Sequence, residues 1–167
     1  MNAFLRVVRL LAIVVWVGGL IFFAFVVAPV AFHVLPSKHE AGLVVAGTLD
    51  VLNRTAGLCW AVFSVASMLL WLRFKPQARM PLMVQVFLVW LMVGATLYVQ
   101  TEIVPAMERD RIAAGGDVDA AAPDNPARLD FERLHPVSEK VEGAALFLGL
   151  GVVVLMGLEK PSAVPTE

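Results

Sequence analysis

The sequence predicts an all-α membrane protein, a bundle of four transmembrane helices with almost no soluble mass. Its 167 residues are 59% hydrophobic and only 16% charged, against roughly 45–50% and 25% in soluble domains. Four long segments contain no charged residue. They are continuous apolar runs, not the alternating pattern of a membrane barrel.

The four uncharged segments set the expected spans. They lie between Arg9 and Lys38, Arg54 and Arg73, Arg79 and Glu102, and Glu142 and Glu159. The last three hold 18, 22 and 16 residues, and a helix needs about 20 to cross the hydrocarbon. We expect spans over about 8–33, 54–73, 80–102 and 138–159, in a single transmembrane domain over 1–167.

The first span is expected to be a retained helix. Arg6 and Arg9 precede it, as basic residues precede the core of a signal peptide. Its apolar core over residues 10–32 is much longer than the 7–15 residues usual for such a core. Pro29 is expected to kink the last turns of this helix and to free a carbonyl group.

The connections differ in character. Residues 40–54 are expected to be helical, as a short interfacial helix or as an outward extension of the second span. Residues 106–126 are rich in Gly, Ala, Asp and Pro and predict a mobile outer loop. Asn125 and Pro126 resemble an N-cap followed by proline at the first helical position, which predicts a helical entry to the last span. We expect Pro136 to interrupt that entry.

Basic residues set the expected orientation. Arg6 and Arg9 flank the first span, and Arg73, Lys75 and Arg79 lie between the second and third. The third connection holds twice as many acidic as basic residues. Because Lys and Arg accumulate in cytoplasmic flanks, we expect both termini in the cytoplasm, in a bacterial inner (plasma) membrane.

Composition narrows the function classes. The formal net charge of −1 gives no indication of nucleic-acid binding. The single cysteine excludes an intrachain disulfide. The sequence contains no GxSxG, HExxH, phosphate loop or dinucleotide-binding turn. We therefore favour a role without catalysis.

Polar residues gather at the expected outer ends of the spans. The candidate cluster consists of His135, Glu142, Arg54, Glu102, Asn53 and Ser138. Because the fourth span is short, Glu142 is drawn toward the hydrocarbon, where an ionisable group needs a partner or a function. Arg54 is its predicted partner. The two either form a structural pair or headgroup contacts, or they belong to a ligand or proton-handling site.

His135 has several open roles. It precedes Pro136 at a helix entry, where it can cap a carbonyl, pair with a carboxylate such as Glu102, or bind a ligand. Haem and copper sites use imidazole nitrogen, yet the chain has no CxxCH and no pair of histidines inside the spans. We therefore predict no metal and no cofactor, with haem or copper at His135 as the alternative.

Two stretches carry a family resemblance. The first helix reads WVGGLIFFAFVVAPVAF, and the last is preceded by FERLHPVSEKVEG. Together they resemble the bacterial domain of unknown function 4149 family, which is similar to the eukaryotic transmembrane protein 205. The matching positions are Gly18, Gly19, Phe22, Pro29, Phe32, Pro105, Phe131, Leu134, His135 and Ser138. Relatives often carry Asn where this chain has Glu142, so no specific site transfers.

The resemblance implies a fold and a topology but no reaction. Two classes of function remain. One is a non-enzymatic membrane protein, such as a transport accessory, a stress-tolerance factor or a subunit of a larger complex. The other is a haem- or copper-linked redox protein, which a distant similarity to the copper-resistance D and HemJ-type proteins would imply. Expected partners are the lipid bilayer and other membrane proteins or further copies of the chain.

Overall fold

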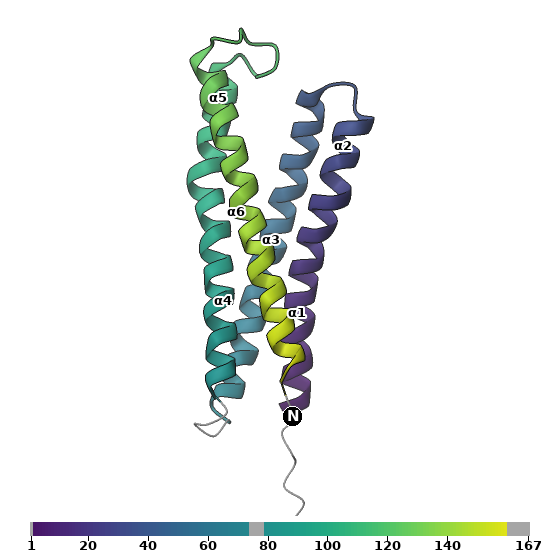
Figure 1. Ribbon diagram of the computed structural model, residues 1–167, viewed down its shortest axis with the longest axis vertical. Helices are drawn as coiled ribbons and strands as arrows, with labels where there is room; N and C mark the ends of the chain where they lie inside the picture. Colours follow the sequence, from purple (N-terminus) through teal and green to yellow (C-terminus); the bar gives the residue numbers. More distant parts are fainter. Residues whose placement is uncertain (1, 74–78, 160–167) are drawn as a thin grey trace, which may run out of the picture.

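The computed structural model describes residues 2–73 and 79–159, which form helices and the turns between them. The elements are α1 (Asn2–Phe22), η1 (Phe23–Val27), α2 (Ala28–Val34), α3 (Lys38–Trp71), α4 (Arg79–Tyr98), η3 (Val99–Ile103), α5 (Val104–Ala113) and α6 (Pro126–Gly157). They make four long columns that are apolar enough to cross a membrane (Figure 1). The predicted class, an all-α four-helix membrane bundle, is confirmed.

The columns pair into two antiparallel hairpins. In the first hairpin, α1 and α2 pack on α3, and in the second, α4 and α5 pack on α6. Contacts of α1 with α6 and of α3 with α4 join the hairpins. We call the end where α1 begins and α6 ends the terminal end, and the end with the turns over 35–37 and 114–125 the loop end.

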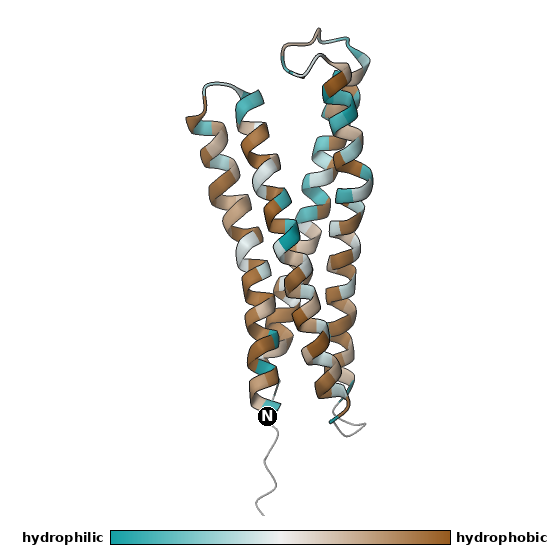
Figure 2. Ribbon diagram, turned by 180° about the vertical axis from the view of Figure 1, so that it is seen from behind, coloured by the Kyte–Doolittle hydropathy of each residue, from teal (hydrophilic) through white to brown (hydrophobic). Residues whose placement is uncertain are grey.

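The hairpins are joined at the terminal end and diverge toward the loop end (Figures 1 and 2). There α2 contacts only η1 and α3, and α5 contacts only η3 and α6. The main core lies nearer the terminal end, with Trp16, Phe63, Met92 and Val152 all at most 2% exposed. The packing between the two hairpins is therefore concentrated toward the terminal end.

The outer surfaces of the columns are strongly apolar (Figure 2). Phe25 and Phe147 leave more than two thirds of their surface exposed. A water-soluble protein rarely exposes large apolar patches, whereas a bilayer covers them with lipid tails. The chain is therefore an integral membrane protein in contact with lipid.

Two prolines explain the two π-helical segments. Pro29 and Pro105 have no backbone N–H, so neither can bond the carbonyl four residues earlier. In each case the residue before the proline donates to the carbonyl five residues earlier: Ala28 to Phe23 and Val104 to Val99. The predicted disturbance at Pro29 thus takes the form of a π turn, and Pro105 repeats it in the second hairpin.

The helices extend further than the predicted spans. Residues 40–54 belong to α3, so they extend the second span and do not form a separate helix. Ser37 caps this helix by accepting from the N–H of Glu40 at 3.1 Å. Asn125 caps α6 as expected, accepting from the N–H groups of Ala127 and Arg128.

Two expectations for the third connection are wrong. Residues 106–113 are helical, because Pro105 fits the first turn of α5. The helix ends before Gly115 and Gly116, whose φ values of 92° and 97° suit glycine. Pro136 does not interrupt α6, which runs continuously past it. Pro136 lies on the exposed side of the helix.

Candidate functional site

A buried polar cluster closes the terminal end. A guanidinium nitrogen of Arg9, on α1, donates to Oε1 of Gln85, on α4. Nε2 of Gln85 in turn donates to Oε1 of Glu159, just after α6, at 2.8 Å. Arg9 and Gln85 are both fully buried. These bonds link the first hairpin to the second.

Charge and an aromatic ring complete this terminal cluster. Nη1 of Arg9 lies 3.9 Å from Oε1 of Glu159, and Nε of Arg6 lies 3.8 Å from its Oε2. The Arg9 guanidinium also sits over the ring of Phe63, on α3, at 4.8 Å from the centroid. A charge within a membrane-spanning helix requires such partners. All four columns therefore contribute to holding Arg9.

Sequence reasoning missed this cluster. Arg9 was interpreted as a positive flank of the first span, which explains orientation but not burial. A usable signal was present, because Gln85 interrupts an apolar run and Arg9 falls inside the expected first span. Polar residues inside two spans often face one another. The positions of Arg9 and Gln85 in the sequence gave no reason to pair these two residues.

The predicted pair of Glu142 and Arg54 is wrong. Nη2 of Arg54 instead lies 2.9 Å from Oδ2 of Asp50, one turn earlier on the same helix, and the Arg54 side chain is 80% exposed. The backbones of α3 and α6 do not come within 8 Å of one another between Cα atoms, because the two helices stand diagonally across the bundle. The similar depth predicted for Glu142 and Arg54 therefore did not bring the two side chains together.

His135 lies on the surface of α6 and has local partners. Its ring stacks on Phe131 with centroids 6.1 Å apart, and its Nε2 lies 3.4 Å from Oε1 of Glu139. Ser138 donates its hydroxyl to the His135 carbonyl at 2.7 Å. Glu102 is exposed on η3 and is not the carboxylate that His135 meets. The structure thus favours a local role for His135.

Glu142 and Asn53 are left without partners. Both carboxylate oxygens of Glu142 and the amide nitrogen of Asn53 are buried and lack a hydrogen bond. Glu142 precedes the buried Ala145 and Gly149 by three and seven residues, so it lies on the inward face of α6. Asn53 likewise precedes the buried Ala56 by three residues on α3. Of the predicted cluster, these two face the interior of the bundle.

The described residues contain no group of three or more His, Cys, Asp or Glu side chains that could hold a metal ion. His39 approaches Asp117 at 4.0 Å across the loop end, as an isolated pair. Cys59 is buried among apolar core residues. Among the described residues, the His, Cys, Asp and Glu side chains therefore stand singly or in pairs.

Comparison with known proteins identifies the family. The sequence profile of the domain of unknown function 4149 matches residues 11–111. The chain belongs to the domain of unknown function 4149 family. Neither the curated proteins nor the solved structures include a match to it. The resemblance drawn from Gly18, Gly19 and Pro29 is confirmed.

The match to domain of unknown function 4149 ends within α5. It therefore covers Arg9's helix from residue 11 onward and all of α4, including Gln85. It does not reach the stretch FERLHPVSEKVEG, so Phe131, His135 and Glu142 receive no support from it. The similarity to transmembrane protein 205 stays a prediction.

Proposed function

We propose that this protein is a non-enzymatic membrane protein that binds a proton or a small cation at Glu142, as part of a transport process. The observation that carries this proposal is the carboxylate itself. Both of its oxygens are buried without a hydrogen-bond partner, within a membrane-spanning helix. An unpaired buried charge costs several kcal/mol. The group is therefore stable when it holds a proton or a cation.

The shape of the bundle supports this proposal. The terminal cluster of Arg9, Gln85 and Glu159 joins the hairpins below Glu142, and the hairpins diverge above it at the loop end (Figure 1). We place the entry of a small ion on the loop-end side of Glu142, because the hydrogen bonds of the terminal cluster join the hairpins on the other side. Asn53, whose amide is also buried and unpartnered, supplies a further polar group on the inward face of α3.

The environment of the protein is part of the proposal. The positive flanks around Arg6, Arg73 and Arg79 favour a bacterial inner membrane with both termini in the cytoplasm. The loop end, and access to Glu142, would then face outward. The protein would then bind the transported ion, or contact the larger complex that uses it, on the outer side of the membrane.

A hydrophobic carbodiimide tests the proposal, because such reagents enter membranes and modify protonated carboxyl groups in apolar surroundings. We expect stoichiometric modification of Glu142, read by peptide mass spectrometry. Glu142→Gln should abolish it, and Glu139→Gln, which removes an exposed carboxylate one turn away, should not. Protection by added Na⁺ or K⁺ would indicate a cation; protection only by raised pH would indicate a proton. An unmodified Glu142 would overturn the proposal.

We also propose that the protein works without haem or copper. His135 contacts Phe131 and Glu139, and among the described residues no group of three or more His, Cys, Asp or Glu side chains could hold a metal ion. A visible absorption spectrum and a copper assay of the purified protein decide this point. A Soret band or stoichiometric copper would replace the ion-binding proposal with the redox alternative.

A further inference from the structure

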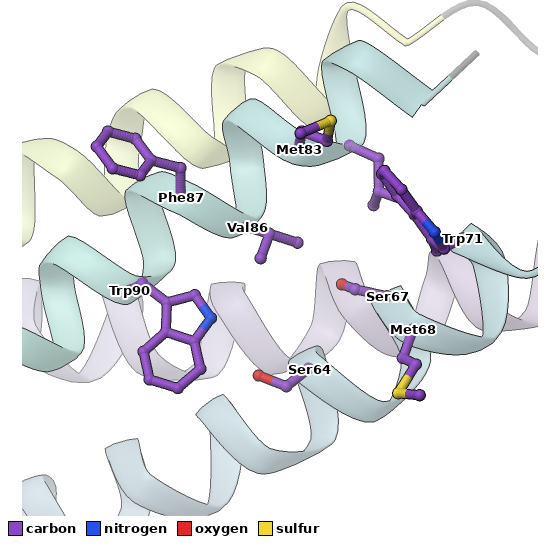
Figure 3. Close-up of a pocket in the computed structure, with 9 residues that line it drawn as sticks. Ser64, Ser67, Met68, Trp71, Met83, Val86, Phe87 and Trp90 are labelled. Atoms are coloured by element: carbon purple, nitrogen blue, oxygen red, sulfur yellow. The ribbon is translucent and has the colours of Figure 1, made fainter. Parts of the chain in front are cut away.

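The lateral groove between α3 and α4 does not account for the buried carboxylate of Glu142. Ser64, Ser67 and Trp90 are among the side chains that line this groove (Figure 3), and the described residues around it carry no charge. Ser67 donates its hydroxyl to the carbonyl of Phe63 at 2.7 Å. Any partner of Glu142 must come instead from the segments that pack against α6, which are α1, α4, η3 and α5.

The register of the second hairpin places Glu142 beside the π turn η3. Glu142 comes seven residues, about two helical turns, before Gly149, so both lie on one face of α6. A Cβ built on Gly149 would lie 2.9 Å from Cε of Met92, on α4. Because the two columns are antiparallel, seven residues along from Met92 leads to Val99, the first residue of η3, which is fully buried. The helix α6 also packs against η3.

The π turn leaves the carbonyl of Gln100 without a helical donor. In an α-helix the N–H of Val104 would bond this carbonyl, but here it donates to the carbonyl of Val99. A π-type bond to Gln100 would have to come from Pro105, which has no N–H. Gln100 is half-buried. A backbone carbonyl at membrane depth needs a donor, so this one is available as an acceptor beside Glu142.

We infer that Glu142 binds a proton and, as a carboxyl group, donates its O–H to the carbonyl of Gln100. This inference rests on the proposed function and selects the proton from its two candidate ligands. A carboxyl group is a hydrogen-bond donor only when it is protonated, whereas a carboxylate would set its negative charge against the carbonyl oxygen. Magnesium and calcium take about six or more oxygen ligands, but a proton needs one acceptor. The π turn supplies that acceptor.

The first hairpin contains a matched control. In η1 the N–H of Ala28 donates to Phe23, and Pro29 has no N–H, so the carbonyl of Ala24 lacks a helical donor in the same way. No Cα atom of η1 lies within 8 Å of a Cα atom of α6. The same π turn is therefore present where it does not pack against the helix that carries Glu142.

Labelling with a hydrophobic carbodiimide tests the pairing, because the rate reports the protonated fraction of Glu142. The purified full-length protein is labelled at the pH at which the wild-type rate is half-maximal. Pro105→Ala restores an N–H, so Val104 can bond Gln100 again. We expect the labelling rate to fall roughly fivefold, as the loss of one hydrogen bond implies. Pro29→Ala makes the same change in η1 and should leave the rate unchanged.

The outcomes separate this inference from the proposed function. Equal effects of Pro105→Ala and Pro29→Ala would overturn the inference alone. Protection of Glu142 by Na⁺ or K⁺ at constant pH would also overturn it, because a cation would then occupy the place of the proton, and the proposed function would stand. A Glu142 that is not labelled at any pH would overturn both.

A second measurement leaves the helix unchanged. The carbonyl carbons of glutamine are labelled with ¹³C and followed by nuclear magnetic resonance in detergent. Raising the pH removes the donor from Glu142 and should shift the Gln100 signal. The shift should be absent from Glu142→Gln, whose side-chain amide can donate at every pH. A Gln100 signal that responds to pH equally in the wild type and in Glu142→Gln, or in neither, would overturn the inference.

Discussion

Arg9 carries its charge into a membrane-spanning helix because groups from the other hairpin meet it there. Gln85 accepts its hydrogen bond, and Glu159 supplies the opposite charge. Removing one member of such a cluster leaves the others buried and unsatisfied, whereas replacing two members together with apolar groups is often nearly neutral. The energetic role of Arg9 can therefore be measured only with its partner.

Variants of the terminal cluster should show this coupling. Gln85→Leu leaves Arg9 without its acceptor, and we expect a loss of about 1–3 kcal/mol of unfolding free energy. The double variant Arg9→Met, Gln85→Leu should be more stable than Gln85→Leu alone. Thermal unfolding in detergent measures both. Gln100→Leu, at the other glutamine of the same column, should cost less. A double variant less stable than Gln85→Leu would contradict the assigned contact.

Single residues mark the limit of what the sequence could predict. The sequence singles out Glu142, because an acid beside a short span must lie near the hydrocarbon, and the structure buries both of its carboxylate oxygens. The predicted partner of Glu142 was wrong, because Arg54 pairs with Asp50 on its own helix. Arg9 looked like a flank because charge alone does not reveal which side of a helix is buried.

At the scale of elements, close approach of helices depends on Gly149. A Cβ built on Gly149 would lie 2.5 Å from Cγ2 of Val17 and 2.9 Å from Cε of Met92. The glycine thus brings α6 against α1 and α4 at once, as small residues do in membrane bundles. Val17 is β-branched and buried, so it has little freedom to move away.

Gly149→Ala should therefore destabilise the bundle by about 1–3 kcal/mol through overpacking. Gly151→Ala is the matched control, because a Cβ there meets nothing within 4 Å. Both variants add one methyl group to the same helix, so their helix propensities cancel in the comparison. Thermal unfolding in detergent measures the difference. Equal stability of the two variants would contradict the close packing of α6 on α1.

Element types were predictable and element bounds were not. Length and apolarity predicted four spans, because crossing the hydrocarbon imposes a minimum run. The helices nevertheless continue beyond the predicted spans: α3 already begins at Lys38, and α5 extends the third column to Ala113. The ends of these helices are polar, so a search for apolar runs does not detect them. The predicted cap at Asn125 gave the start of α6 correctly, whereas the cap that the structure shows at Ser37 was not among the predictions.

At the scale of the whole molecule, the two hairpins are built alike. Each has a column with a π turn before a proline, followed by an N-capped long helix. Pro29 and Pro105 are 76 positions apart, and so are Arg9 and Gln85, which bond across the junction of the hairpins. The sequences themselves show no repeat. The terminal cluster thus forms where equivalent positions of the two hairpins meet.

This architecture makes the orientation testable with two insertions. Helix α3 ends and helix α4 begins at the terminal end, and the turns after α5 lie at the loop end. Pro76 stands between α3 and α4 in the sequence, outside the residues that the structure describes. A membrane between these ends places them on opposite sides, and we propose from the excess of Lys and Arg that the terminal end faces the cytoplasm. A reporter fused after Pro76 should therefore give a cytoplasmic signal, and one fused after Gly116 an external signal.

Reversed signals would invert the orientation but keep the fold. Signals from the same side would contradict the four-span topology, because no bundle of this connectivity has both sites on one face.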